Sequence, residues 1–293
     1  MALLFSSSNR DDTAVYVRQN LNLLSNNTPE AKERRRLVER ALYDALENDS
    51  IRIHYQPICD SKTGKIRSAE ALVRLCDPNL GTVFPDEFIP IAEETGDIIW
   101  LGEYVFENAC KFLSAGNALA HGLEYMEVNL STIQCLDLDL ANKFTAIADK
   151  YNISPSSITL EITETTEAYS EVGMRQVMTD LLAAGFSFAL DDFGTGYANY
   201  SYIVNYPFKL IKIDKSFLWS INDKPENKIV FEAMLQLIDN LGKKTVVEGV
   251  ETEEQQRLLT NKGVDYLQGY YYSKPIPENQ FISYIKHHNA AAG

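Results

Sequence analysis

The most informative residues of this chain of 293 residues are two adjacent carboxylates, Asp191 and Asp192. The apolar run before them predicts a strand, and Gly194 and Gly196 predict a turn after it. Because side chains alternate along a strand, two neighbouring acids at its end can reach two different points. Two hard cations could share one of these carboxylates while each binds another. The simpler interpretation, which these residues alone leave open, is that the pair caps the next helix.

Polar or ionised side chains also stand at the ends of the other predicted strands. In chain order these residues are Glu70, Asn129, Glu161 with Glu164, Lys212, Glu248 and Gln268. Taken singly, each has an ordinary explanation as a solvated or capping residue, since most polar side chains face water. Taken together around one point, the carboxylates would be prohibitively costly to bury without cations. A ligand set made only of oxygen atoms favours Mg²⁺ or Mn²⁺ over zinc or copper.

Such a cup of acids, with one lysine and two amides, predicts hydrolysis of a phosphodiester. Two cations would neutralise the phosphoryl oxygens, activate a water molecule and stabilise the leaving alkoxide. Lys212 would stabilise the charge of the transition state or orient the water. Glu248 would accept the proton of that water or hold the second cation.

The segments that must position these groups alternate between strand and helix patterns. Strand-like runs span residues 51–58, 66–75, 125–130, 157–162, 186–190, 210–213, 244–247 and 266–267. Helical patterns lie between most of them, at residues 85–94, 103–115, 141–151, 172–184, 228–241 and 253–262. A short polar turn, residues 59–65, joins the first two strands, which only an antiparallel hairpin permits. The sequence therefore predicts an α/β fold, a TIM-like (β/α)8 barrel with an antiparallel first strand, whose active site lies at the carboxyl ends of the strands.

Composition and charge exclude several other classes of protein. The net charge of −14 argues against binding to a nucleic-acid polymer, which needs basic patches. The four cysteines show no CxxC spacing, so free thiols in the cytoplasm are expected rather than a zinc site. No apolar run approaches the roughly 20 residues of a membrane span.

Three regions are expected, with the bounds that the family resemblance described below implies. Residues 1–34 are expected to form an N-terminal linker and helix, residues 35–286 the catalytic domain, and residues 287–293 a C-terminal tail. Thr28 and Pro29 predict the start of a helix that continues to about Asn48. Its charged run, residues 32–36, is expected to be a solvated face rather than a binding patch.

Several motifs together resemble the EAL-domain family of cyclic-di-GMP phosphodiesterases. They are Tyr55-Gln-Pro-Ile58, Glu70-Ala-Leu-Val-Arg-Leu75, Phe88-Ile-Pro90, Ala92-Glu-Glu-Thr-Gly96, Val128-Asn-Leu-Ser131, Leu160-Glu-Ile-Thr-Glu164, Asp191–Tyr197, Lys212-Ile-Asp214, Glu248–Thr252 and Gln268-Gly-Tyr270. The resemblance covers roughly residues 35–286, in order. It implies a TIM-like barrel that linearises cyclic-di-GMP to pGpG with two Mg²⁺ or Mn²⁺ ions.

The resemblance also implies a role for each matching residue. Glu70, Asn129, Glu161 and Asp191 would hold one metal ion, and Asp191, Asp192 and Glu248 the second. Lys212 would contact the nucleophilic water, with support from Gln268. The residues expected at the substrate are Gln56, Arg74, Asp214 and Glu251, with Arg74 pairing a phosphate oxygen. Glu164 would steady the loop after Asp192, which in the family also takes part in dimer contacts.

One departure from the family pattern lies in that loop. Ala198, Asn199 and Tyr200 stand where two serines and a leucine are usual, which removes a hydroxyl group. The family also implies a homodimer and an upstream sensor or GGDEF domain in a longer protein. The alternative is a catalytically weak receptor or scaffold for cyclic-di-GMP. Because loss of catalysis normally shows as a substitution in the metal set or the lysine, and neither is substituted, the active enzyme is the favoured interpretation.

Overall fold

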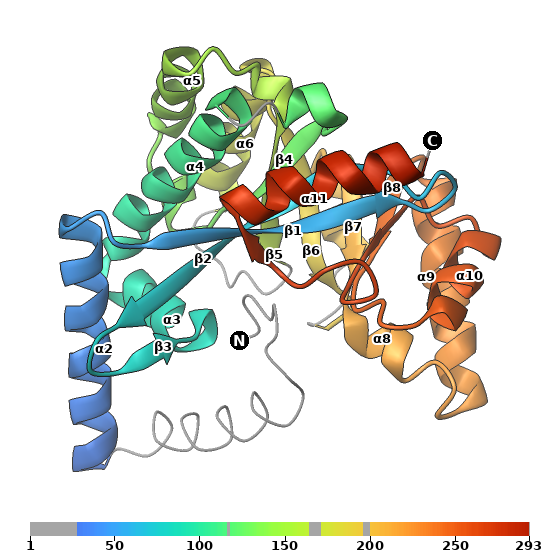
Figure 1. Ribbon diagram of the computed structural model, residues 1–293, viewed down its shortest axis with the longest axis horizontal. Coiled ribbons are helices and arrows are strands. Elements are labelled where there is room, and N and C mark those ends of the chain that lie inside the picture. The colour runs from blue at the N-terminus through green and yellow to red at the C-terminus, as the bar shows by residue number, and fades with distance from the viewer. Residues whose placement is uncertain (1–27, 116–117, 164–170, 196–199, 293) are drawn as a thin grey trace.

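The computed structural model describes residues 28–115, 118–163, 171–195 and 200–292 (Figure 1). Its strands are β1 (Arg52–Asp60), β2 (Ile66–Asp77), β3 (Gly81–Val83), β4 (Tyr125–Asn129), β5 (Ile158–Thr163), β6 (Ser187–Phe193), β7 (Leu210–Ile213), β8 (Lys244–Val247), β9 (Tyr266–Gln268) and β10 (Ile276–Pro277). The α-helices are α2 (Pro29–Glu47), α3 (Pro85–Thr95), α4 (Asp97–Ala115), α5 (Leu140–Lys150), α6 (Glu171–Ala183), α7 (Tyr200–Asn205), α8 (Lys215–Trp219), α9 (Pro225–Asn240), α10 (Glu253–Asn261) and α11 (Glu278–Ala291). Three 3₁₀ turns complete the set, at Leu119–His121, Gln134–Leu136 and Pro155–Ser157.

The strands close into a barrel in which only the first strand runs against its neighbours. Strand β1 pairs antiparallel with β2 on one side and with β9 on the other. From β2 the order continues through β4, β5, β6, β7, β8 and β9, and each of these pairs is parallel. The predicted TIM-like barrel with a reversed first strand is therefore confirmed. Two short strands, β3 and β10, pair with β2 and β1 and were not predicted.

The β1–β2 connection shows why the first strand must be reversed. Its turn is held by the carboxylate of Asp60, which accepts hydrogen bonds from the backbone of Lys62 and of Thr63. Gly64 has φ +69°, a backbone conformation that favours glycine. A turn this short leaves no length for a crossover helix, so the two strands are antiparallel.

Apolar side chains form two separate cores. The larger one lies between the strands and the surrounding helices. A small second cluster consists of Ile58, Ala189, Leu210 and Val246, against which Tyr266 packs. Because side chains alternate along a strand, these residues share the inward face with the strand-end residues predicted above, so the second cluster fills the barrel interior below them.

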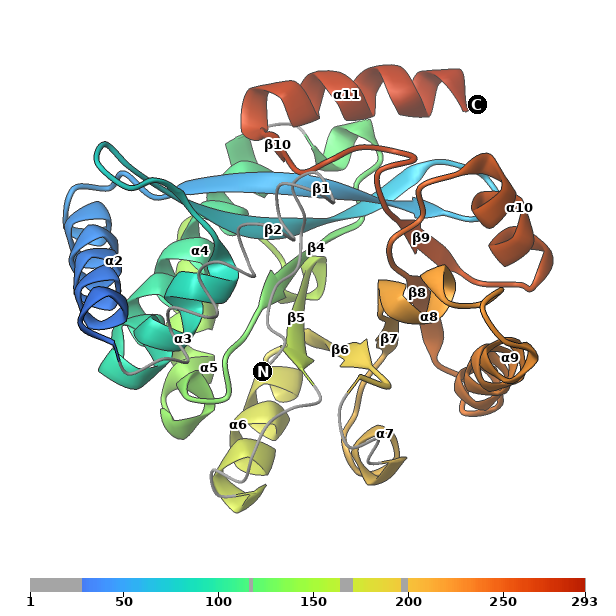
Figure 2. The ribbon, with the colours of Figure 1, turned by 90° about the horizontal axis from the view of Figure 1, so that it is seen from below.

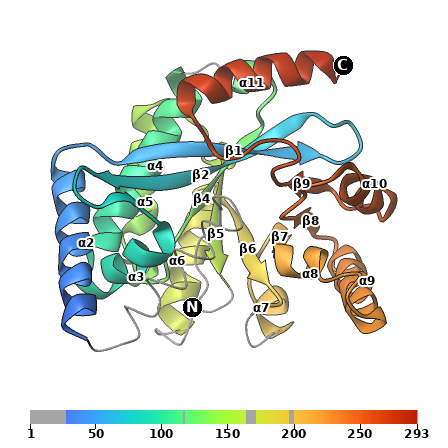
Figure 3. The same ribbon diagram turned by 60° about the horizontal axis from the view of Figure 1, so that its bottom comes forward.

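The outer helices differ in how they cover the barrel. Helix α11 lies along β1 in all three ribbon views, while α2 stands at one end of the molecule beside α3 and α4 (Figures 1, 2 and 3). Thr28 caps α2 by accepting a hydrogen bond from the backbone of Ala31, as its sequence predicts. Both expected region boundaries fall inside helices, since α2 continues across residue 34 and α11 across residue 286.

The charged run on α2 is not simply a solvated face. Arg34 forms a two-pronged ion pair with Glu87 of α3, at 2.7 and 2.9 Å, and only 3% of the Glu87 side chain is exposed. Arg35 pairs with Glu94 farther along the same helix. The prediction for residues 32–36 was therefore wrong for Arg34, whose partner acid lies 53 residues away in sequence, whereas the Arg35–Glu94 pair lies on the solvated surface.

Cysteines and helix hydropathy agree with the sequence analysis. Cys59, Cys76, Cys110 and Cys135 are all free thiols. In the part of the chain that the structure describes, no helix combines the length and apolar character needed to cross a membrane.

Candidate active site

Lys212 occupies the centre of a cup at the carboxyl ends of the barrel strands. It lies on β7 between Ile211 and Ile213, so strand alternation turns its side chain into the barrel, where it has no exposed surface. Its Nζ lies near carboxylate oxygens from five other segments. The distances are 2.8 Å to Glu161, 3.0 Å to Glu248, 3.4 Å to Glu70, 3.6 Å to Asp191 and 3.8 Å to Glu127.

Amide side chains frame one of these carboxylates. Glu70 accepts a hydrogen bond from Asn129 at 3.1 Å on one oxygen and from Gln268 at 2.7 Å on the other. The same Gln268 amide donates to Gln56 at 3.4 Å, and Gln56 donates to the backbone oxygen of Ser273. These contacts link β1, β2, β4 and β9 across the mouth of the barrel. Glu70 is therefore held in one orientation by two uncharged amide donors together with the Lys212 ammonium group.

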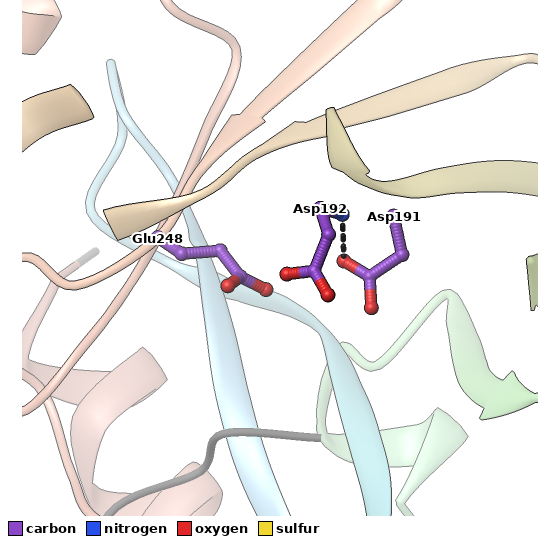
Figure 4. Close-up of side chains that lie close together, drawn as sticks. All are labelled: Asp191, Asp192 and Glu248. Atoms are coloured by element: carbon purple, nitrogen blue, oxygen red, sulfur yellow. Dashed lines mark hydrogen bonds between the residues drawn. The ribbon is translucent and has the colours of Figure 1, made fainter. Parts of the chain in front are cut away.

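The Asp191–Asp192 pair is shaped by an unusual backbone conformation. Asp192 has φ +53°, in the left-handed region that non-glycine residues seldom adopt. Its N–H donates to the Asp191 carboxylate at 2.9 Å, the contact drawn as a dashed line in Figure 4. Both carboxylates and that of Glu248 point toward one another, and one oxygen from each lies within 4.8 Å of the others. Three ligand atoms thus surround a space in which a cation could be bound.

Burial and mutual repulsion raise the pKa of most acids in the cup. Desolvation, together with repulsion from Asp191 and Glu248, raises the pKa of Asp192 to about 9. Desolvation likewise raises the pKa of Glu248 to about 8, although Lys212 opposes the shift. It raises the pKa of Glu161 well above its usual range.

In contrast to these acids, Glu70 and Lys212 have pKa values shifted in the direction that favours their charged forms. Burial opposes ionisation of both, but Lys212 and the two amide donors hold the pKa of Glu70 below its usual value. The carboxylates around Lys212, Asp191 and Glu161 first, outweigh its desolvation and raise the pKa of its ammonium group well above its usual range. Lys212 is therefore a permanent cation in this site.

The donor set fits hard divalent cations. One ammonium group is too little positive charge for so many buried acids. Neither oxygen of Glu161 accepts a well-formed hydrogen bond within the described residues, although Oε1 forms the ion pair with Lys212. Oxygen ligands of this kind suit Mg²⁺ or Mn²⁺. The residues present therefore fit the group that the sequence analysis expects.

The remaining predicted residues lie around this cluster or outside the described chain. Asp214 caps helix α8 by accepting from the backbone of Ser216. Arg74, on β2, is half-buried; burial lowers its pKa, and Glu70 and Tyr270 oppose this. Glu251 lies in the turn before α10, with its N–H bonded to Gln255. Glu164 and the altered positions 198–199 lie outside the described residues.

Glu127 is the site residue that sequence analysis missed. It lies on β4, fully buried, two residues before Asn129 and therefore on the same inward face. Desolvation raises the pKa of its carboxyl group. The signal that could have found it is the alternation of the strand, which turns Glu127 and Asn129 to one side.

The turn that carries Glu248 is braced by helix α8. The indole N–H of Trp219 donates to the backbone oxygen of Gly249 at 2.8 Å. Gly249 has φ +71°, and a Cβ added there would lie 2.3 Å from the Cβ of Lys215. The close approach of α8 therefore requires glycine directly after Glu248.

The fold and site together define a TIM-like barrel with an acidic cup at the carboxyl ends of its strands. The model of the EAL domain family matches residues 39–275, and the chain belongs to this family.

Comparison with known proteins gives several related sequences and structures. The signaling protein YkoW of Bacillus subtilis is 36% identical over 247 residues, which are 84% of this chain and 31% of YkoW. The cyclic di-GMP phosphodiesterase PdeL of Escherichia coli is 34% identical over 247 residues, 84% of this chain and 68% of PdeL. A solved structure of the MucR phosphodiesterase in complex with c-di-GMP is 33% identical, with a TM-score of 0.78 over 84% of this chain and 99% of that one. The chain spans about a third of the length of the first curated relatives that it matches.

Proposed function

We propose that this chain hydrolyses cyclic-di-GMP to linear pGpG in a reaction that depends on Mg²⁺ or Mn²⁺. The observation that carries the proposal is the set of carboxylates from separate strands around Lys212. Family membership and the names of PdeL and MucR support the substrate. The chain also retains every metal-set residue and the lysine that the family resemblance implies.

Two groups of side chains would hold the cations. Glu70, Asn129, Glu161 and Asp191 form one set, and Asp191, Asp192 and Glu248 form the other. The bound ions would supply charge neutralisation at the phosphate and a water molecule of lowered pKa.

The chain's own residues account for the rest of the chemistry. The Lys212 ammonium group orients the attacking water and stabilises the negative charge that develops on the phosphate. The Glu248 carboxylate, 3.0 Å from Lys212, accepts the water proton. Gln268 keeps Glu70 in place through its 2.7 Å hydrogen bond.

Substrate binding is assigned to polar groups at the rim of the cup. Arg74 pairs with a phosphate oxygen, and Gln56 contacts the substrate beside it. Asp214 and Glu251 bind a guanine base or order the cation ligands, and Glu164 steadies the loop after Asp192.

The wider biology follows the family. We expect residues 35–286 to act as the catalytic domain, in a cytoplasmic homodimer that an upstream sensor or GGDEF domain controls in a longer protein.

An Asp191→Asn variant separates an enzyme from a receptor. Binding of c-di-GMP and formation of pGpG are measured for the wild-type chain and the variant, each with Mg²⁺. If the chain is an enzyme, the wild-type chain forms pGpG and the Asp191→Asn variant does not. A wild-type chain that binds c-di-GMP and releases no pGpG would instead be a receptor.

A further inference from the structure

We propose that Glu127 is a positioning residue for Lys212. When cations bind the carboxylates at the mouth of the barrel, Glu127 holds the ammonium group from deeper inside the barrel. Its kinetic consequence rests on the proposed function, because it assumes that the cup binds divalent cations.

Glu127 belongs to a deeper layer than the other acids. The residues of this layer stand two positions before the cup residues of their strands: Ser68, Glu127, Thr159, Ala189, Leu210 and Val246. Several of them, with Ile58 of β1, make up the small apolar cluster inside the barrel. A carboxylate among such neighbours is costly unless an opposite charge lies close.

Lys212 is the partner that this carboxylate meets. Glu127 Oε2 lies 3.8 Å from Lys212 Nζ, and no other described cation pairs with Glu127. Its Oε1 accepts a hydrogen bond from Ser68 at 3.5 Å, while Oε2 accepts none within the described residues. The carboxyl group of Glu127 also lies within hydrogen-bonding reach of the Glu161 side chain, so Glu127 faces both the ammonium group and one residue of the proposed cation-binding sets.

Cations in the cup would change the balance of charge around Lys212. Four of its five carboxylate neighbours, Glu70, Glu161, Asp191 and Glu248, belong to the proposed cation-binding sets. Once divalent ions engage these oxygens, their attraction for the ammonium group weakens and the ions repel it. Among the carboxylates that the structure describes around Lys212, Glu127 alone lies outside those sets, so it keeps the ammonium group where it faces the water.

Chemical labelling tests this role without turnover. Lys212 acetylation by acetic anhydride is followed by mass spectrometry, with and without Mg²⁺, using exposed lysines as internal standards. With Mg²⁺ we expect about tenfold faster labelling of Lys212 in Glu127→Met than in the wild-type chain, because Glu127 and Lys212 are in contact and such pairs are strongly coupled. Glu127→Gln, which keeps an acceptor oxygen, should fall between them.

Thr159→Val is the matched control, because Thr159 is a buried polar residue of the same layer. It should label like the wild-type chain. Equal labelling of Lys212 in Glu127→Met and wild type with Mg²⁺ would overturn the proposal. If Glu127→Met does not fold, Glu127→Gln decides, and labelling of this variant at the wild-type rate overturns the proposal.

A double-mutant cycle gives the kinetic test. Glu127→Met should lower kcat about tenfold with little change in KM, and should cause no further loss in a Lys212→Met background. The same loss in both backgrounds would show that Glu127 does not act through Lys212. If the wild-type chain does not hydrolyse c-di-GMP, the proposed function fails, whereas the labelling comparison still decides the role of Glu127.

Discussion

Lys212 has no exposed surface, yet its ammonium group lies within 4 Å of carboxylates from five other segments of the chain. It therefore serves both folding and the proposed chemistry. Without it the acids would repel one another in a medium of low dielectric constant. With it, a fixed positive charge faces the place where a phosphate would gain negative charge.

Replacing Lys212 should separate binding from turnover. In Lys212→Met we expect hydrolysis of c-di-GMP to fall about 10²–10³-fold, as when one fixed donor to a transition state is lost. Binding of c-di-GMP should be largely retained, because the rim residues are unchanged. Turnover by chromatography and affinity by calorimetry give the two values, and undiminished turnover would contradict the role of Lys212.

The same variant should depend on cations for stability. Removing the ammonium group leaves buried carboxylates uncompensated. Addition of Mg²⁺ should therefore raise the Tm of Lys212→Met more than the Tm of the wild-type chain, because a ligand of the native state stabilises it by mass action. An equal rise in both chains would indicate that Mg²⁺ binds elsewhere.

The raised pKa values predict how stability changes with pH when metal is absent. Asp192 and Glu248 have ordinary pKa values of 3.8 and 4.5, and in the folded chain about 9 and about 8. At a pH between the ordinary and the folded pKa of each group, the folded state binds more protons than the unfolded state, so stability falls as pH rises. The pKa of Glu70 is lowered in the folded chain, so Glu70 changes the pH dependence of stability only below its ordinary pKa of 4.5.

Thermal unfolding in EDTA tests this sign. We expect Tm to fall from pH 5 to pH 9, and to fall less in Asp192→Asn, which removes one of the titrating groups. The asparagine side chain tolerates the left-handed backbone at this position, so the variant should fold. A Tm that rises across this range would contradict the pKa shifts.

At the residue scale, much of the site was predictable because it follows strand ends. Asp191 and Glu248 each close an apolar run, Lys212 lies near the end of another, and a barrel brings such ends together. Glu127 was not predictable in the same way, because it lies inside a strand rather than at its end. Reasoning from strand ends passes over it, although alternation from the predicted Asn129 assigns Glu127 to the inward face.

At the scale of elements, helix α8 connects the centre of the site to its rim. It begins at Lys215, directly after its N-cap Asp214, and ends at Trp219, whose indole bonds to the turn of Glu248. A short helix therefore links the segments that carry Lys212 and Glu248, the groups proposed to orient the attacking water and to accept its proton. The position of Glu248 depends on this contact.

Trp219→Phe should weaken the site through the Glu248 turn. The variant keeps an aromatic ring and loses the hydrogen bond to Gly249, which is worth about 1 kcal/mol. We expect turnover to fall several-fold and the Mg²⁺ concentration for half-maximal activity to rise.

Trp100→Phe is the matched control, because Trp100 lies at the surface of α4 with 40% of its area exposed. It should leave both values unchanged. An identical Mg²⁺ dependence in Trp219→Phe and wild type would show that the indole contact does not position Glu248.

Element types were predicted better than element ends. The β7 and β8 strands match their apolar runs, whereas α4 begins at Asp97, earlier than the pattern indicates. Strands β3 and β10 are two or three residues long, too short for alternation to give a signal. They form because a neighbouring strand offers unpaired backbone groups, which is a tertiary effect.

At the scale of the whole molecule, α2 is joined to the barrel layer by both apolar packing and charge. Val38 and Leu42 are fully buried on one face of α2, and Arg34 pairs with Glu87 of α3. The apolar face was predictable from helical spacing. The ion pair was not, because its two residues are 53 positions apart.

Arg34→Met should therefore destabilise the chain. It leaves the buried Glu87 carboxylate without its two-pronged partner, at a cost of roughly 3 kcal/mol. Arg36→Met is the control, since Arg36 pairs with Glu33 on the exposed surface and should change stability by less than about 0.5 kcal/mol. Equal urea midpoints for the two variants would contradict this anchoring role.

The most direct test of the proposed function is the fate of c-di-GMP itself. The chain is incubated with c-di-GMP and Mg²⁺ or Mn²⁺, and the nucleotides are separated by chromatography. We predict that pGpG accumulates with time, and that EDTA abolishes its formation. Substrate that remains intact in the presence of both metals would contradict the proposal that this cup of carboxylates is a phosphodiesterase site.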